Sequence, residues 1–365
     1  MTLVLWLYRI FFIPLLLVVG PIYLWKSRGR TGAKSVMGQR MGRLPELPAK
    51  RPDVKRVWIQ AVSVEFLAVQ PVIDALLADE AVEVIVTTTT TTSQQMAQER
   101  YGDSVLLVGY FPIDFWPWTS GSWERIRPDL MLLTEGEWWP EHLAQAKRRG
   151  VPVLGLNARM SDRSFGRMRL VRPLLAGVRA GLTRLLASSA VDAERFRLLG
   201  FRDEEVIVTG NIKVDLVINP IADDAALKLK ESLGFGAKDL ILLGASTWAD
   251  EEAALLRVWE SVREAGDAPL RLLLVPRHAE RRGEVEAIVK ESGATYVLRS
   301  RDEIESEIEV CIADTTGELQ RLTQIADIVF GGRTLPPHRE GQTPVEAAGL
   351  GRALVVGPEM TNFRA

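Results

Sequence analysis

The stretch "DLILLGASTWADEEAALLRVWESVREAG" (residues 239–266) decides the fold class of this chain. Its opening run "DLILLGAS" is apolar and rich in branched side chains, which is typical of a strand buried in a parallel sheet. The segment "DEEAALLRVWESVREAG" then repeats apolar residues at the spacing of an amphipathic helix. Together they predict one strand-helix unit of an α/β fold.

The same alternation recurs along the chain in two series. The first series of expected strands is "RVWIQAV", "VEVIVTT", "SVLLVGY", "DLMLLT", "VPVLGL" and "LTRLLAS". The second is "DLILLGAS", "LRLLLVP", "ATYVLRS", "EVCIAD", "ADIVFGG" and "ALVVGP". Helical patterns separate them, so the sequence predicts two facing Rossmann-like domains with a break between Lys213 and Pro220.

Composition narrows the class of protein. The chain has 365 residues, 47% of them hydrophobic, which is enough for two ordinary cores. Its net charge of -2 argues against a nucleic-acid partner, because nucleic-acid binders carry a strong basic excess. A single cysteine, Cys311, excludes an internal disulfide, and the scattered His142, His278 and His338 do not suggest a zinc site.

The amino terminus is apolar. Residues 10–25 read "IFFIPLLLVVGPIYLW" without a charge, and the whole apolar region approaches the length that spans a bilayer. The basic segment that follows predicts, by the positive-inside rule, a membrane anchor after which the rest of the chain stays in the cytoplasm, next to anionic lipids. The apolar segment looks separable from both domains, so its removal is expected to leave a protein that folds. A hydrophobic helix docked on the protein itself is the alternative.

Polar side chains follow the strands of the first series. Glu65 comes just after "WIQAVSV", and Glu135 and Glu137 follow the fourth strand. Two carboxylates at neighbouring strand ends suit a proton-transfer task, one as base and one as orienting partner. Asn157 and Arg159 follow the fifth strand. Carboxylates that only offset a helix dipole are the alternative.

The second series carries groups suited to an anion. Ser246 and Thr247 lie where a strand meets a helix, a place where backbone amides can hold an anion, although both residue types are also ordinary helix caps. Arg277 and His278 directly follow another strand, and a planar guanidinium there can clamp a phosphate, unless it is simply a surface residue.

Two further strand ends add to this group. Gly317 and Glu318 lie in "DTTGEL", and Glu346 lies in the first turn of a helix, where it accepts hydrogen bonds from ribose hydroxyls or complements the helix dipole. The chain lacks an Asp-x-Asp pair of the kind that binds a divalent metal to a diphosphate, so neither a metal nor another cofactor is implied.

These motifs together resemble the Kdo transferases, membrane-anchored glycosyltransferases of GT-B architecture that move 3-deoxy-manno-octulosonic acid (Kdo) from CMP-Kdo to a lipid A precursor. The matching stretches are "AVSVE", "VTTTT", "EGEWWP", "NARMSDRS", "VTGNIKVD", "GAST", "VPRH", "DTTGEL", "PVEAAGLG" and "GPEMTNFR". They run in the order found in that family from the anchor to the last residues.

The resemblance implies roles for these positions. Glu65 stands at the position of the general base and Glu137 at that of the second characteristic carboxylate, with Asn157 and Arg159 on the acceptor side. The residues implied in donor binding are Ser246, Thr247, Arg277, His278, Gly317, Glu318, Thr343 and Glu346. The implied domains are an anchor (residues 1–28), an acceptor domain (29–215) and a donor domain (216–365) that is expected to be truncated.

Three positions depart from the family pattern. The usual Gly before the base is missing, which leaves Glu65 or Phe66 at the base position. Trp248 stands where the family tends to have His, and Thr343 where it tends to have Asn. Two alternatives therefore stay open: a lipid-directed GT-B enzyme that uses a UDP donor, and a membrane-bound nucleotide-sugar-binding protein that has lost turnover.

Overall fold

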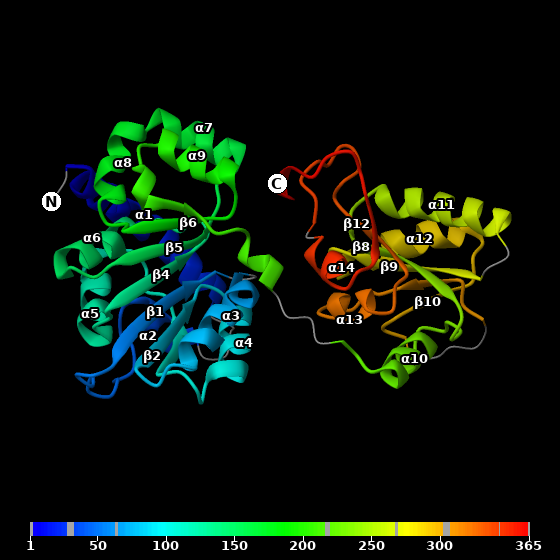
Figure 1. Ribbon diagram of the computed structural model, residues 1–365, viewed down its shortest axis with the longest axis horizontal. Helices are drawn as coiled ribbons and strands as arrows, with labels where there is room; N and C mark the ends of the chain where they lie inside the picture. Colours follow the sequence, from blue (N-terminus) through cyan, green and yellow to red (C-terminus); the bar gives the residue numbers. More distant parts are fainter. Residues whose placement is uncertain are drawn as a thin grey trace. The chain divides into compact units, whose positions relative to one another are not determined.

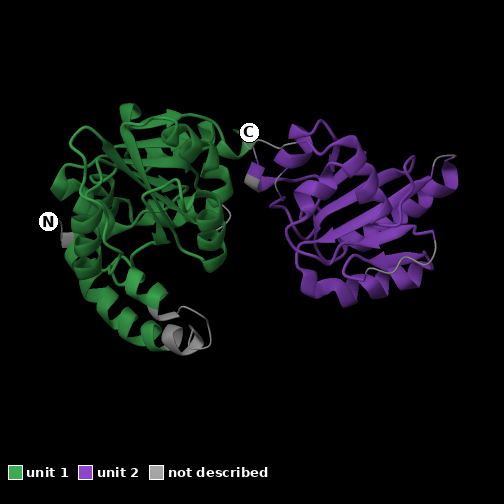
Figure 2. Ribbon diagram, turned by 90° about the horizontal axis from the view of Figure 1, so that it is seen from below, with its two compact units in different colours: residues 1–216 green, residues 217–365 purple. Residues whose placement is uncertain are grey.

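The protein folds into two α/β units. The structure, a computed structural model, describes residues 3–27, 33–62, 65–215, 220–266, 269–301, 307–342 and 344–363 (Figure 1). The chain divides into Met1–Leu216 and Val217–Ala365 (Figure 2). Each unit holds one parallel sheet, which confirms the predicted fold class.

The sheet of the first unit has seven strands in the order β3-β2-β1-β4-β5-β6-β7, and all neighbours are parallel. The strands are β1 (Lys55–Ala61), β2 (Val82–Thr88), β3 (Leu107–Tyr110), β4 (Leu130–Thr134), β5 (Val153–Ala158), β6 (Arg184–Ala187) and β7 (Val206–Val208).

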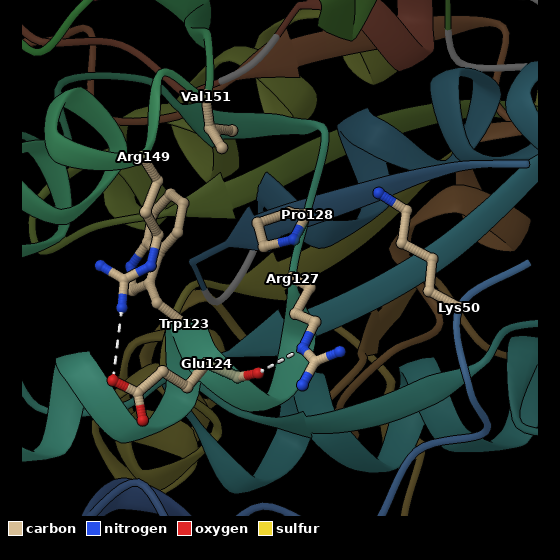
Figure 3. A pocket seen from close by; sticks show the side chains of 7 residues that line it. All are labelled: Lys50, Trp123, Glu124, Arg127, Pro128, Arg149 and Val151. Carbon is tan, nitrogen blue, oxygen red and sulfur yellow. Dashed lines mark hydrogen bonds and ion pairs between the residues drawn. The ribbon is translucent and has the colours of Figure 1, made fainter. Parts of the chain in front are cut away.

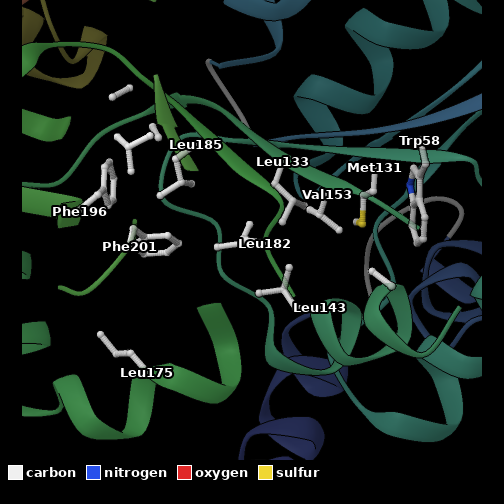
Figure 4. Close-up of a cluster of buried hydrophobic side chains, with 14 of the residues drawn as sticks. Trp58, Met131, Leu133, Leu143, Val153, Leu175, Leu182, Leu185, Phe196 and Phe201 are labelled. Carbon is white, nitrogen blue, oxygen red and sulfur yellow. The ribbon is translucent and has the colours of Figure 1, made fainter. Parts of the chain in front are cut away.

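Helices cover both faces of this sheet because its strands are apolar on both sides. Trp58, Met131 and Leu133 point to a core shared with α5, α6, α8 and α9 (Figure 4), and Val57 and Ile59 point to a second core under α3 and α4. The helices are α1 (Leu3–Ser27), α2 (Ala33–Arg40), α3 (Glu65–Leu77), α4 (Thr91–Tyr101), α5 (Trp116–Ile126), α6 (Pro140–Arg149), α7 (Asp162–Leu170), α8 (Arg172–Arg179) and α9 (Ala190–Leu198), with the 3₁₀ turns η1 (Asp203–Glu205) and η2 (Ile212–Asp215).

The sheet of the second unit has six parallel strands in the order β10-β11-β9-β8-β12-β13. The strands are β8 (Leu240–Thr247), β9 (Leu270–Pro276), β10 (Tyr296–Leu298), β11 (Val310–Ile312), β12 (Ile328–Gly331) and β13 (Ala353–Val356). The helices are α10 (Asp223–Glu231), α11 (Glu251–Ala265), α12 (Arg282–Ser292), α13 (Leu319–Thr323) and α14 (Val345–Gly349), with η3 (Ala279–Arg281) and η4 (Thr361–Phe363).

Both sheets have a point where the strand order reverses. In the first unit it lies between β1 and β4, and in the second between β8 and β12. Beyond the carboxyl ends of such strands the following loops separate to opposite faces and leave a crevice, which is where open α/β sheets bind ligands. The candidate site residues are therefore expected at the carboxyl ends of β1 and β4 in the first unit and of β8 and β12 in the second.

Candidate functional site

The carboxyl end of β1 leads directly into α3. Glu65 is the first residue of α3, and its side chain lies outside the described residues. Phe66, the other residue considered for the base position, is fully buried and packs edge-on against Tyr101 of α4, with ring centroids 6.1 Å apart. An apolar ring in the core cannot accept a proton, so Phe66 is excluded as a base.

The end of β4 carries a charged cluster. Glu135 adopts a left-handed backbone conformation (φ 54°), and its Oε1 lies 3.2 Å from Nζ of Lys213 and 3.6 Å from Nη1 of Arg159. Lys213 belongs to η2, which contacts α3. Two cations from separate segments thus converge on one carboxylate at the reversal point of the sheet.

Lys213 is the site residue that the strand and helix patterns missed. They placed it at the edge of a linker, and its only signal was its position in the motif "VTGNIKVD".

Glu137 and Asn157 lie on the two loops beside this cluster. Oε2 of Glu137 accepts a hydrogen bond of 2.7 Å from the indole N–H of Trp139. Asn157 is 5% exposed, has a left-handed backbone (φ 50°), and accepts a hydrogen bond of 3.3 Å from the amide of Ile212. The structure thus brings Asn157, Arg159 and Lys213 together around the loop that carries Glu135 and Glu137.

Buried polar atoms without a partner mark the same edge. The side-chain nitrogens of Gln60 and Asn157 and the hydroxyl of Thr134 are buried, and none has a hydrogen-bond partner among the described residues. They come from the ends of the neighbouring strands β1, β4 and β5. Since buried polar groups are nearly always paired, this edge has unused capacity to bind water or a ligand.

In the second unit, the turn after β8 is tightly built. Ser246 is 7% exposed with a left-handed backbone (φ 55°), and the fully buried Thr247 has a hydroxyl without a partner among the described residues. Gly332, after β12, lies so close that a Cβ there would be 2.3 Å from the carbonyl oxygen of Ser246. Only glycine fits this approach between the two strands at the reversal point.

Glu251, in the first turn of α11, fastens these two loops together. Its carboxylate is buried and accepts four backbone hydrogen bonds, from Trp248 (2.9 Å), Arg333 (2.8 Å), Thr334 (2.8 Å) and Leu335 (3.1 Å). Local patterns could not distinguish Glu251 from the adjacent acids, because three of its four donors lie 82 to 84 residues further along the chain.

A small cavity lies between these loops and α14. It brings Ser246 and Glu346 together, as predicted for two donor-binding residues, although no bound donor tests their roles. Burial raises the pKa of Glu346. Thr343 lies outside the described residues. The lining consists of Ala245, Ser246, Leu319, Thr323, Val329, Gly331, Gln342, Glu346, Ala347 and Leu354.

Gly317 and Glu318 lie between β11 and α13 and do not line this cavity. Gly317 has φ 87°, which glycine adopts without strain. Burial opposes ionisation of Glu318, but hydrogen bonds from Thr315 and Arg299 outweigh it and lower its pKa. Glu318 is therefore a carboxylate that is already engaged within the unit.

Arg277 and His278 follow β9 and are exposed. The amide of Arg277 donates to the carbonyl of Thr247 (3.0 Å), which places it beside the turn after β8. Trp248 is the centre of an adjoining aromatic cluster. Its ring lies 5.4 Å from that of His278 and 5.0 Å from that of His338, and the Arg333 guanidinium stands 4.7 Å from its centroid.

Another surface depression lies elsewhere in the first unit. Figure 3 shows it beside Arg127 and Pro128, which precede β4, so it is at the amino ends of the strands. Its groups are satisfied by one another: Glu124 pairs with Arg149 at 3.7 Å, and its carbonyl accepts from Nε of Arg127 at 3.1 Å. Those predicted residues that the structure describes are at the opposite ends of the strands.

The described residues form no candidate metal site: their His, Cys, Asp and Glu side chains make no group of three or more placed to hold a metal ion.

Comparison with known proteins identifies a family whose members this chain resembles in sequence. The family model described as 3-Deoxy-D-manno-octulosonic-acid transferase (kdotransferase) matches residues 35–216. A 3-deoxy-D-manno-octulosonic acid transferase of Haemophilus influenzae is 30% identical over 367 residues, covering 98% of this chain and 84% of the relative. One of Bordetella pertussis is 30% identical over 355 residues, covering 94% and 81%.

Solved structures support the fold. The crystal structure of UDP-GlcNAc 2-epimerase from Neisseria meningitidis bound to UDP-GlcNAc is 13% identical, covers 83% of this chain and 82% of its own, and superposes with a TM-score of 0.55. At this identity the likeness concerns the fold alone, a GT-B arrangement of two parallel-sheet units. The 30% identity to these two transferases over nearly the whole of this chain shows that the chain belongs to the Kdo transferase family.

Proposed function

We propose that the protein transfers Kdo from CMP-Kdo to a lipid A precursor in lipopolysaccharide biosynthesis. The observation that carries the proposal is where residues of the shared motifs lie. Glu135, Arg159 and Lys213 meet at the reversal point of the first sheet, and Ser246 and Glu346 line a cavity at that of the second. The relatives that share these motifs over nearly the whole chain are named for this reaction.

The two units have separate tasks in this proposal. Residues 29–215 bind the acceptor and residues 216–365 bind the donor. In the donor unit, the backbone around Ser246 and the exposed Arg277 hold the phosphate of CMP, and Glu346 accepts hydrogen bonds from the ribose. The guanidinium of Arg277 is exposed and in no ion pair with another described residue, which supports its assignment to a phosphate.

The reaction is an inverting displacement. Glu65 removes the proton from a sugar hydroxyl of the acceptor, the resulting oxygen attacks the anomeric carbon of Kdo, and the bond from that carbon to the phosphate of CMP breaks. Positive groups placed in advance stabilise the charge that grows on the departing phosphate. Glu137 and the group of Glu135, Arg159 and Lys213 orient the acceptor beside Glu65.

The transfer is proposed to need no metal. CMP carries a single phosphate, so Arg277 and a helix amino end supply enough positive charge for its departure. The protein is further proposed to act at the inner membrane, with its two units on the cytoplasmic side and in contact with anionic lipids. The long apolar helix α1 supports attachment to a membrane, because Val4–Pro21 is long and apolar enough to cross one.

One assay tests the function. Purified full-length protein in detergent receives CMP-Kdo and a lipid A precursor, with and without EDTA, and CMP release is measured together with the mass of the lipid. Release of CMP with the addition of Kdo in both samples is the expected result. Turnover that requires a UDP-sugar, or CMP binding without release, contradicts the proposal and favours one of the two alternative functions.

Glu65→Gln tests the mechanism in the same assay. The variant should keep its melting temperature and its affinity for CMP, while turnover falls by about 10² to 10⁴, the range usual for removal of a general base. Glu137→Gln serves as the matched carboxylate variant. Near-normal turnover of Glu65→Gln together with inactive Glu137→Gln would move the base to Glu137.

A further inference from the structure

The anchor helix α1 is bound to the first unit at its amino-terminal end. The hydroxyl of Tyr8 donates to Oδ2 of Asp114 (2.8 Å), and Arg9 forms two hydrogen bonds with the buried carboxylate of Glu141, one of them 2.9 Å long. Phe12 stacks on Phe115, with ring centroids 5.9 Å apart. These contacts join residues 8–12 of the helix to the unit that carries the candidate site.

The chain returns to the same unit directly after the helix. In α2, Oε1 of Gln39 accepts a hydrogen bond from the amide of Tyr110 (2.8 Å), and the carbonyl of Arg40 accepts one from Ile113 (2.8 Å). Residues 8–12 of α1 and residues 39–40 of α2 are thus both attached to one globular unit. If α1 crossed a bilayer, these two stretches would lie on opposite sides of it, which this arrangement does not allow.

Length supports the same conclusion. The helix has 25 residues, from Leu3 to Ser27, and its segment beyond Phe12 is about 22 Å long at 1.5 Å per residue. That is shorter than the hydrocarbon core of a bilayer, about 30 Å.

The rest of the surface of α1 is exposed and apolar. The side chain of Phe11 is 72% exposed and that of Leu17 is 70% exposed, so water around this helix would contact a large hydrocarbon surface. Among the side chains of α1 that the structure describes, nine large apolar ones are exposed: Trp6, Leu7, Ile10, Phe11, Ile13, Leu15, Leu17, Val18 and Val19.

The neighbouring helices extend this surface with positive charge. Helix α8 contacts α1, and Leu170 and Leu174 of α7 and α8 are exposed. The four exposed arginines around them form no ion pair with another described residue, so their charge is free to meet an anionic lipid headgroup. They are Arg163, Arg167, Arg169 and Arg172.

We propose that α1 is a monotopic insert: its Tyr8, Arg9 and Phe12 face docks on the first unit, and its other face lies in one leaflet of a phospholipid bilayer. Helices α7 and α8 rest on the headgroups of the same leaflet. The bilayer is the occupant that fits, because the surface combines apolar side chains at the depth of the acyl boundary with arginines that complement anionic headgroups. The proposal concerns attachment and does not depend on the reaction.

Cysteine labelling of the full-length protein tests the topology. Thr2→Cys marks the amino terminus, Ser104→Cys marks an exposed position of the first unit, and the parent chain controls for the buried Cys311. Each protein is expressed in a Gram-negative host, and a membrane-impermeant maleimide is added to intact and to permeabilised spheroplasts. The proposal expects Thr2→Cys and Ser104→Cys to react alike, both only after permeabilisation.

Two results overturn it. Reaction of Thr2→Cys in intact spheroplasts, while Ser104→Cys needs permeabilisation, shows a helix that crosses the membrane. Recovery of the parent chain in the soluble fraction shows that no bilayer covers α1. Since labelling does not involve CMP-Kdo, neither result bears on whether the protein transfers Kdo.

Vesicle binding tests the surface itself. Full-length protein is sedimented with vesicles of phosphatidylethanolamine and phosphatidylglycerol. The pair Phe11→Gln and Leu17→Gln should weaken binding at least tenfold at all salt concentrations, because each removes apolar surface from the lipid. The pair Arg169→Gln and Arg172→Gln should reduce only the part of vesicle binding that is lost at high salt, because salt screens the attraction between arginines and anionic headgroups. Binding equal to that of the parent in both pairs would overturn the proposed surface.

Discussion

Arg9 of α1 and Glu141 of α6 are 132 residues apart in the chain, yet they form a two-point ion pair around a carboxylate that is fully buried. Helix α6 follows the loop that carries Glu137, so the anchor helix holds the first turn of a helix at the edge of the candidate site. These contacts argue against the expectation that the apolar segment is separable from the fold. Its removal would leave Glu141 buried without its charge partner.

Arg9→Leu should therefore destabilise the protein. Removing one partner of a buried ion pair typically costs about 3 to 5 kcal/mol, because the remaining charge is buried without compensation. The melting temperature of the full-length variant in detergent measures this effect. Arg167→Leu, at an exposed arginine without an ion pair to a described residue, is the matched control and should melt like the parent. If Arg9→Leu also melts like the parent, the ion pair contributes nothing.

Asp114 should give the protein a pH-dependent stability. Burial raises its pKa from 3.8 to about 7, although Tyr8 and the amides of Glu141 and His142 donate hydrogen bonds to it. Because the folded pKa exceeds the unfolded one, the neutral carboxyl stabilises the fold fully below about pH 4. That contribution is lost as the pH rises to about 7.

The unfolding free energy of the parent is compared with that of Asp114→Asn at each pH. The comparison is needed because the neighbouring His142 contributes to stability with the opposite dependence on pH in both proteins. Burial lowers the pKa of His142 from 6.5 to about 3. Because the fold keeps His142 neutral, its contribution to the stability of the fold is lost as the pH falls from about 6.5 to about 3. Arg9 and Glu141 are the other charged groups close by. From pH 4 to 7 the unfolding free energy of the parent should fall relative to that of the variant by up to about 4 kcal/mol. Parallel profiles would show that Asp114 does not titrate in this range.

Glu251→Gln should loosen the turn after β8. The amide side chain keeps one acceptor oxygen but turns an NH₂ group toward backbone N–H groups that need an acceptor, so a loss of about 3 kcal/mol is expected. Thermal unfolding and calorimetric titration with CMP measure stability and donor affinity, and both should decrease. Glu264→Gln, at an exposed position of the same helix, should change neither. Unchanged CMP affinity in Glu251→Gln would separate this turn from the donor site.

Gly332→Ala should have a similar effect through steric overlap. The added Cβ would lie 2.3 Å from the carbonyl oxygen of Ser246, so one loop must move, at a cost of roughly 1 to 3 kcal/mol. The affinity for CMP should fall with the melting temperature. Gly283→Ala is the control, since nothing lies within 4 Å of a Cβ at that position. Equal behaviour of the two variants would mean that the approach of the two loops is not required.

The strands were predictable because each is a short apolar run that ends in polar or small residues. The run "LRLLLVP" coincides with β9, Leu270–Pro276. Strand β7, Val206–Val208, was missed, because it has three residues and the side chains of Ile207 and Val208 are half exposed at the edge of the sheet. A short edge strand of this kind gives no periodic signal.

The site was predictable as a set of strand ends but not as a set of contacts. The ion pair of Glu135 and Lys213 joins residues 78 positions apart, and the pair of Tyr8 and Asp114 joins residues 106 apart. Local patterns contain no information about such partners, since these contacts depend on how the sheet is ordered and where loops meet.

The docking of α1 has a consequence for the order of events during synthesis. Tyr8 and Arg9 leave the ribosome 106 and 132 residues before Asp114 and Glu141, respectively. At about 5 to 20 residues per second this is a delay on the order of 5 to 25 s, during which the newly made helix has no protein surface to bind. Its apolar residues must be held in this interval by lipid or by a chaperone. The helix therefore meets lipid or a chaperone before it meets the globular unit, which assembles against it later.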